Sequence, residues 1–353
     1  MSLDAEKLIG STPLLAGIDL PALEGLLRIF RPMHFDAGAH LVRQGQLASS
    51  AYVIEAGTAE VLTALPGGGE TTVATLGPGS VLGELALLEI GTRVATVTAR
   101  TEVAAHLVER ESFRMLLAQR DRAAFEIQAR IMRALCRRLR DLNARIVAAD
   151  APESAAPPLS GGNAGRDGIR RGAGSFDLRA FLSILPAFRR WDPEEVDAFL
   201  GISDVLTLDR GQILFQQGDA GDAAYVVVRG ALEILRAESG RRHRIGILGP
   251  GRLCGILALI EGQAHSMSAT AREPTVILEL SRPAFDALFT GNDPVAAKFQ
   301  EAINRELRMS LTRTTIHLTR LVSQARIRGG RREEKKAEAL QQALGMTECG
   351  SAG

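Results

Sequence analysis

The sequence is poor in cysteine, tryptophan and tyrosine, with three, one and two of them among 353 residues. The three cysteines, Cys136, Cys254 and Cys349, are far apart and odd in number. This spacing fits neither a framework of disulfide bonds nor a structural zinc site. Such cysteine usage is typical of a reducing compartment, so we predict a cytoplasmic protein.

Long hydrophobic runs are also missing, because no apolar stretch approaches the roughly 18 residues that a membrane-spanning helix needs. The opening residues, MSLDAEKLIG, contain no basic stretch followed by a hydrophobic run. We therefore expect neither a secretory signal nor a membrane partner. The 42 basic residues nearly balance the 41 acidic residues, for a net charge of +1. That balance argues against a chain built wholly to bind nucleic acid or a membrane surface.

Catalytic and metal-binding patterns are absent as well. The six histidines show no metal-ligand spacing, and no Ser/His/Asp or Cys/His arrangement lies near a glycine-rich turn. We therefore predict that the protein is not an enzyme and has no metal or cofactor.

What the sequence does contain is an internal repeat. Two segments, ending at Gly38 and Gly211, run from a Pro-Leu or Leu-Pro start through an apolar helical pattern to a glycine. The landmarks that keep the same shift of 173 residues are Gly45 with Gly218, Tyr52 with Tyr225, and Gly57 with Gly230. Beyond a loop that has lost one residue, Gly83 matches Gly255 at a shift of 172. A series of matched positions of this length, with a single deletion, indicates a tandem duplication.

Each copy reads as a helix, then short strands, then a long helix. After Gly38, short apolar or β-branched runs alternate with glycine-bearing turns, a spacing typical of a compact sandwich or roll. Apolar residues at steps of three and four then predict a long helix over about 120–147 in the first copy. We expect an α+β protein whose segments are a domain at 8–148, a flexible linker rich in Ala, Pro, Gly and Ser at 149–177, a second domain at 178–325 and a charged tail at 326–353.

The most informative chemistry lies in the first copy, in the stretch LGELALLEIGTRVATVTA. Gly83 permits close backbone approach at a turn that opens a short helix, and we predict that free N–H groups of Leu85 and Ala86 form an anion site. Arg93 can add a charge-assisted, bidentate contact to a phosphate. When it is ionised, Glu84 can only accept hydrogen bonds, so it suits a sugar hydroxyl rather than the phosphate. The pattern predicts a small nucleotide pocket on the wall of the roll.

These residues resemble the phosphate-binding cassette of the cyclic-nucleotide-binding domains, a family that includes the bacterial catabolite activator protein and the regulatory subunits of cyclic-AMP-dependent protein kinase. The family's cassette reads Gly-Glu-Leu-Ala followed by Arg-Ala-Ala or similar, and Gly83-Glu84-Leu85-Ala86 and Arg93-Val94-Ala95 match it closely. The resemblance covers both copies. It implies two tandem, jelly-roll-like β-rolls, each flanked by helices and followed by a long C-terminal helix.

The same resemblance implies a role for each site residue. Glu84 would hold the ribose 2′-OH, and Arg93 with the amides of Leu85, Ala86 and Ala95 would hold the cyclic phosphate. The residues that would line the base pocket are Val61, Val73 and Leu85.

The second copy keeps the length of the cassette and loses its chemistry. In CGILALIEGQAHSMSATA, Ile256 stands in place of Glu84 and His265 in place of Arg93. An isoleucine accepts no hydrogen bond from a ribose, and a histidine is mostly neutral at pH 7. Either this copy is a degenerate repeat kept for packing, which we favour, or its site has been retuned for another ligand.

The predicted helix at 120–147 places arginines opposite its apolar stripe. We interpret them as a solvated face beside a helix-pairing seam rather than as a nucleic-acid surface. The two long helices are expected to pair, either within one chain or between two chains. We rank a homodimer through the 120–147 helix first. Transcription factors of the family carry a helix-turn-helix module after the long helix, and too few residues follow the second long helix for one.

The resemblance thus implies a cytosolic sensor that binds a cyclic nucleotide in its first domain and signals to an unknown effector protein by repositioning a helix. Cyclic AMP ranks ahead of cyclic GMP, because Val94 lacks the hydroxyl that helps to hold a guanine in related proteins. The alternatives are a DNA-associated regulator of the same superfamily, a ligand-independent scaffold, and a protein that binds a cyclic dinucleotide.

Overall fold

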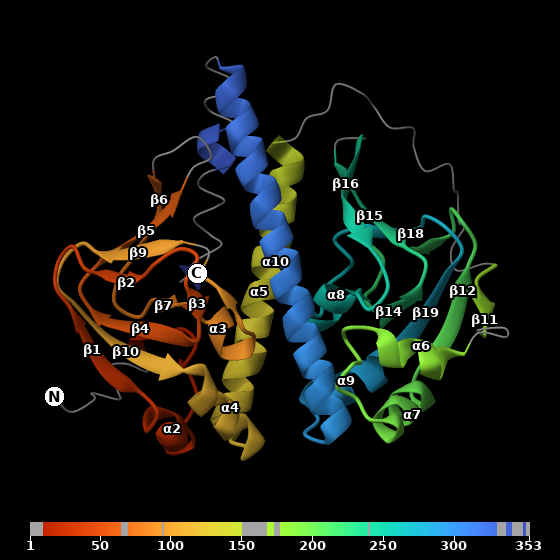
Figure 1. Ribbon diagram of the computed structural model, residues 1–353, viewed down its shortest axis with the longest axis horizontal. Helices are drawn as coiled ribbons and strands as arrows, with labels where there is room; N and C mark the ends of the chain where they lie inside the picture. The colour runs from red at the N-terminus through yellow and green to blue at the C-terminus, as the bar shows by residue number, and fades with distance from the viewer. Residues whose placement is uncertain are drawn as a thin grey trace. The chain divides into compact units, whose positions relative to one another are not determined.

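The computed structural model describes residues 10–64, 70–93, 95–149, 168–172, 177–238, 241–329, 337–340 and 349–350. The chain forms two units, of which the first comprises Met1–Ala149 and Leu307–Gly353 and the second Asp150–Glu306. Each unit contains the roll of one copy of the repeat, and Figure 1 shows in each a roll of short strands accompanied by helices. Equivalent glycines adopt equal conformations: φ is +87° at both Gly38 and Gly211. The α+β fold with two tandem rolls is therefore confirmed.

The roll of the first unit consists of antiparallel strands in two main sheets. The first sheet has the order β1 (Arg31–Phe35), β10 (Val103–Glu109), β4 (Ser50–Ala56), β7 (Val81–Leu82), β20 (Cys349–Gly350). The second sheet has the order β2 (His40–Val42), β9 (Thr96–Ala99), β5 (Ala59–Ala64), β6 (Glu70–Leu76), and a short ribbon pairs β3 (Leu47–Ala48) with β8 (Gly91–Thr92). Inward-facing apolar residues of both sheets, including Ile54, Val61 and Val97, form the core.

Two residues of the predicted tail extend the first sheet at its edge. Strand β20 pairs antiparallel with β7, with Cys349 opposite Leu82 and Gly350 opposite Val81. Most of the other tail residues lie outside the described part of the chain. The tail therefore contributes a strand beside the segment that leads into Gly83.

The helices that accompany the first roll include α2 (Leu20–Leu27), α3 (Leu85–Leu88), α4 (Arg110–Ala118) and α5 (Arg122–Ala149). Helix α4 ends because Arg120 takes a positive φ of 61°, and α5 begins where Asp121 Oδ1 accepts a hydrogen bond of 2.8 Å from the Ala124 N–H. The predicted long helix is thus confirmed within two residues at each end. Its apolar stripe is buried within the single chain, with Ile131 at 0% and Leu135 at 2% exposure. The homodimer through this helix stays a prediction.

The roll of the second unit repeats this plan. One sheet has the order β11 (Arg170–Arg171), β12 (Asp204–Leu208), β19 (Thr275–Ser281), β14 (Ala223–Arg229), β17 (Leu253–Cys254). The other has the order β13 (Ile213–Phe215), β18 (Ser268–Ala271), β15 (Leu232–Glu238), β16 (Arg241–Leu248). The helices of this copy are α6 (Leu178–Ile184), α7 (Pro193–Gly201), α8 (Ile256–Glu261), α9 (Arg282–Thr290) and α10 (Pro294–Arg328).

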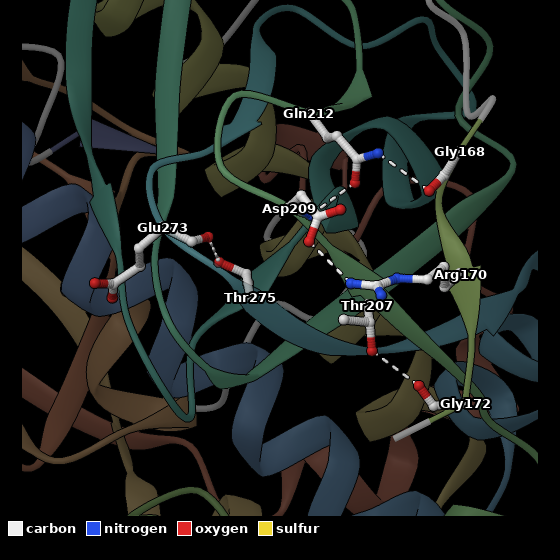
Figure 2. A network of polar contacts seen from close by, with 8 residues as sticks. All are labelled: Gly168, Arg170, Gly172, Thr207, Asp209, Gln212, Glu273 and Thr275. Atoms are coloured by element: carbon white, nitrogen blue, oxygen red, sulfur yellow. Dashed lines mark hydrogen bonds and ion pairs between the residues drawn. The ribbon is translucent and has the colours of Figure 1, made fainter. Parts of the chain in front are cut away.

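Strand β11 lies inside the stretch that the sequence predicts to be a flexible linker. Its Arg170 donates a hydrogen bond of 2.9 Å to Asp209, and the Thr207 hydroxyl donates one of 2.8 Å to the Gly172 carbonyl (Figure 2). Gln212 Nε2 also reaches the carbonyl of Gly168, at 3.1 Å. Residues 168–172 therefore form an ordered edge of the second roll. Residues 150–167 and 173–176 of the predicted linker lie outside the described residues.

Helix α10 is longer than the second copy alone requires. It begins at Pro294 in the second unit, and its residues from Leu307 onward belong to the first unit. Several apolar residues of this later part are buried, including Leu311, Leu318 and Val322, whereas Ile316 is exposed. The C-terminal half of α10 therefore packs as part of the first unit.

Candidate functional site

The turn between β7 and α3 is built around Gly83. Its φ is +74°, a left-handed conformation that a residue with a Cβ rarely adopts. A Cβ at this position would also overlap Nη1 of Arg93 and would lie 3.2 Å from the carbonyl oxygen of Ser50. Glycine is therefore required twice, for the backbone conformation and for the space that Arg93 occupies.

Arg93 lies directly against this turn and is 8% exposed. Its Nη2 donates to the carbonyl oxygen of Ser50 at 2.7 Å and to the Ser50 hydroxyl at 3.2 Å. Its backbone is fixed as well, because its N–H donates to Gln46 and its carbonyl accepts from Gly45. These bonds hold a cationic side chain beside the glycine turn, where a bound anion would need it.

Glu84 is the residue before α3 and is 4% exposed. Its Oε1 lies 3.3 Å from Nη1 of Arg138, which projects from α5, and both side chains are buried. The ion pair connects the cassette to the long helix of the same copy. The interpretation of the α5 arginines as a solvated face is wrong for Arg138, because this side chain is only 8% exposed.

The backbone of the turn corrects one detail of the predicted anion site. The Ala86 N–H donates a hydrogen bond of 2.9 Å to the Gly83 carbonyl, and the Leu87 N–H donates one of 3.1 Å to the Glu84 carbonyl. The prediction that the N–H of Ala86 is free is therefore wrong, because Ala86 already lies in the first turn of the short helix α3.

These residues border a hollow that is formed within the first unit. It is lined by residues of the roll (Ala48, Gly83, Glu84, Leu85, Ala86, Glu89, Gly91, Thr92, Arg93) and of α10 (Arg308, Leu311, Thr312, Thr315). The two charged residues that the cassette pattern predicts, Glu84 and Arg93, thus both line this hollow. The α10 residues were missed, because no local motif relates them to a segment more than 200 residues earlier.

The remaining predicted site residues are placed differently. Val61 and Ala95 are both 0% exposed and belong to the apolar core of the roll. Val73 lies on β6, but its side chain is outside the described part of the structure, as is the whole of Val94. The proposed roles of these residues stay predictions.

The corresponding place in the second unit is filled by protein side chains. His265 stacks on Phe215 with ring centroids 3.8 Å apart and an angle of 12° between the planes, and Tyr225 also stacks with Phe215, with ring centroids 5.7 Å apart. Ile256 is 1% exposed. An apolar and aromatic cluster therefore stands where the first copy has its charged pair, as expected of a degenerate repeat.

A different ion pair holds the second roll to α10. Arg252 donates two hydrogen bonds to Glu306, from Nε at 2.7 Å and from Nη2 at 2.5 Å, and the Leu253 N–H adds a third at 3.1 Å. Burial alone would lower the pKa of Arg252, but its hydrogen bond to Glu306 and that residue's charge raise it. Burial, together with the charge of Glu306, raises the pKa of the adjacent Cys254 thiol to about 12.

Membrane-spanning helices or metal clusters among the described residues would indicate other kinds of function. Among these residues, no helix combines the length and the apolar composition needed to cross a bilayer. No cluster of three or more His, Cys, Asp or Glu side chains in the same residues could hold a metal ion.

Comparison with known proteins points to one family. The family model of the cyclic nucleotide-binding domain matches the chain twice, at residues 32–120 and 205–292. The cyclic AMP receptor protein of Thermus thermophilus is 36% identical over 124 residues, which are 35% of this chain and 57% of that protein. A cAMP-dependent protein kinase regulatory subunit from Blastocladiella emersonii is 22% identical over 79% of this chain and 57% of its own length. The chain thus spans little more than half the length of these two relatives.

A solved structure is similar over most of the chain. The regulatory domain of Toxoplasma gondii PKA, crystallised with cAMP, is 20% identical over 83% of this chain and 93% of that one, with a TM-score of 0.30. The two family matches begin in β1 and in β12, and they include the cassettes at Gly83 and Gly255. The chain is a member of the cyclic nucleotide-binding domain family, with two copies of the domain in tandem.

Proposed function

We propose that the protein is a cytosolic sensor that binds one cyclic mononucleotide, cyclic AMP in preference to cyclic GMP, in the hollow of the first copy. The observation that carries this proposal is that Glu84 and Arg93, both almost fully buried, border the same hollow beside Gly83. Arg93 supplies a fixed cation for the cyclic phosphate, and Glu84 supplies an acceptor for the ribose 2′-OH.

The cassette also suggests how binding is transmitted. Glu84 already pairs with Arg138 of α5, so a ribose hydroxyl that bonds to Glu84 competes with this helix for the same carboxylate. Weakening the pair lowers the free energy that holds α5 against the cassette. The ligand thereby shifts an equilibrium between two arrangements of α5, and a separate effector protein reads the difference.

The relatives in this family are regulators, namely a receptor protein and a kinase regulatory subunit. A regulatory rather than an enzymatic role for this chain agrees with them. The second copy serves packing in this proposal, because His265, which stands at the sequence position of Arg93, is stacked on Phe215.

The experiment is a thermal-shift screen of the full chain against cyclic mononucleotides and cyclic dinucleotides. A ligand at 100 times its dissociation constant stabilises the folded state by about 2.7 kcal/mol, which raises the Tm by several degrees. We expect the largest rise with cyclic AMP, a smaller one with cyclic GMP and none with the dinucleotides. A rise with a dinucleotide alone would contradict the proposed ligand class.

A further inference from the structure

One cation beside the cassette comes from neither the predicted motif nor the first copy of the repeat. Arg308 of α10 borders the hollow together with Glu84 and Arg93, and all three residues belong to the first unit. Its guanidinium lies directly on the backbone of Gly91: a Cβ at that position would overlap Nη1 of Arg308 and would lie 2.8 Å from Cζ. Gly91 does not have a positive φ, so room for Arg308 is the structural reason for a glycine there.

The surroundings of Arg308 differ from those of the other arginines at the cassette. Arg93 bonds to Ser50 and Arg138 pairs with Glu84. The half-buried Arg308 has no hydrogen bond and no ion pair with any residue that the structure describes. A partly desolvated guanidinium without a partner is unfavourable, and an anion entering the hollow would supply one.

The spacing of the lining residues along α10 indicates which face of this helix is turned toward the hollow. The α10 residues that line the hollow are Arg308, Leu311, Thr312 and Thr315, at steps of three, one and three. Steps of three and four place side chains on one face of a helix. One face of α10 is therefore turned toward the cassette, and Arg308 is its charged residue.

We propose that Arg308 is a second phosphate-binding residue of the first-copy site, which takes the anionic group of the ligand from the side opposite the Gly83 turn. This inference rests on the proposed function, since it assigns a further contact to the same cyclic nucleotide. Gly91 lies two residues before Arg93, so a guanidinium on Gly91 is close to the predicted phosphate position. The ligand's phosphate, held by Arg93 and Arg308 together, ties the C-terminal half of α10 to the cassette.

Calorimetric titration of the full chain with cyclic AMP tests this role. We expect Arg308→Gln to weaken binding by about 10- to 100-fold, as for the loss of one charge-assisted hydrogen bond. Arg308→Lys, which retains the charge without the bidentate geometry, should recover part of this loss. Arg320→Gln is the matched control, because Arg320 is an exposed arginine on the same helix. It should bind like the wild type.

A purely structural role for Arg308 predicts a different result. Because Arg308 has no partner among the described residues, Arg308→Gln should leave the Tm of the ligand-free protein unchanged and reduce only the rise produced by cyclic AMP. A lower Tm without ligand, together with an unchanged affinity, would overturn the proposal.

Gly91→Ala offers an independent variant that retains the arginine. Its methyl group must displace the guanidinium, so we expect weaker binding in the wild-type background and little additional loss in the Arg308→Gln background. Fully additive losses would contradict the proposal. If the wild type itself binds no cyclic nucleotide, the proposed function fails; if it binds and Arg308→Gln equals Arg320→Gln, only the role of Arg308 fails.

Discussion

Arg138 Nη1 lies 3.3 Å from Glu84 Oε1, and the two side chains are 8% and 6% exposed. One residue comes from the long helix α5 and the other from the turn that opens the cassette. A pair in this position has two effects, since it stabilises the contact between helix and roll and occupies the carboxylate that the proposed ligand needs.

The first prediction concerns this ion pair. Arg138→Gln leaves a buried carboxylate without its cation, so we expect the free energy of unfolding to fall by about 3 kcal/mol. Urea unfolding measures this change, and Arg137→Gln is the control, because Arg137 is the exposed neighbour on the same helix. Equal stability of the two variants would show that the pair does not hold the helix.

The second prediction concerns the ribose contact. Glu84→Ala should reduce the affinity for cyclic AMP by about 1.5–3 kcal/mol, the cost of losing a hydrogen bond to a charged acceptor. The wild type should bind 2′-deoxy cyclic AMP more weakly than cyclic AMP, whereas Glu84→Ala should bind both alike. If the variant still discriminates between them, the 2′-OH is recognised elsewhere.

The third prediction follows from the buried thiol of Cys254. Its pKa is raised from 9.0 to about 12 by burial and by the charge of Glu306, so the folded state retains a proton that the unfolded chain loses above pH 9. The associated stability is complete below pH 9 and declines as the pH rises toward 12. Between pH 8 and pH 10 the free energy of unfolding should fall by about 1.4 kcal/mol through this group.

Comparison with Cys254→Ala isolates this contribution. The variant should lose less stability than the wild type over the same pH interval, whatever its stability at pH 8. Parallel pH profiles for the two proteins would mean that the Cys254 thiol does not titrate differently in the folded and unfolded states.

The fourth prediction concerns the attachment of α10 to the second roll. Glu306→Gln removes the charge from a carboxylate that accepts three hydrogen bonds from Arg252 and Leu253. Since the variant leaves Arg252 buried without a counter-charge, we expect a loss of about 3 kcal/mol in the free energy of unfolding. Glu273→Gln, at an exposed position of the same unit, should change stability by less than about 0.5 kcal/mol.

Much of the fold could be predicted because the repeat depends on backbone geometry. Gly83 and Gly255, with φ of +74° and +82°, mark the same turn in both copies, and their spacing is visible in the sequence. The extent of α5 followed from its apolar periodicity. By contrast, β11 and β20 have two residues each, too few for any period to show.

The candidate site could be predicted only in part, for a physical reason. The positions of Glu84 and Arg93 are set by a local turn, so a local motif finds them. Arg138 and Arg308 reach the same place from helices distant in sequence, and their orientation depends on how those helices pack. From sequence alone, an arginine on a helix is predicted to be solvent-exposed, because its tertiary contacts are not visible there.

Titration of the full chain with cyclic AMP in a calorimeter tests the central claim most directly, using the wild type, Arg93→Ala and His265→Ala. We predict a single site per chain in the wild type, an affinity loss of roughly 3 kcal/mol or more in Arg93→Ala, and wild-type binding in His265→Ala. Wild-type affinity in Arg93→Ala, or loss of binding in His265→Ala alone, would contradict it.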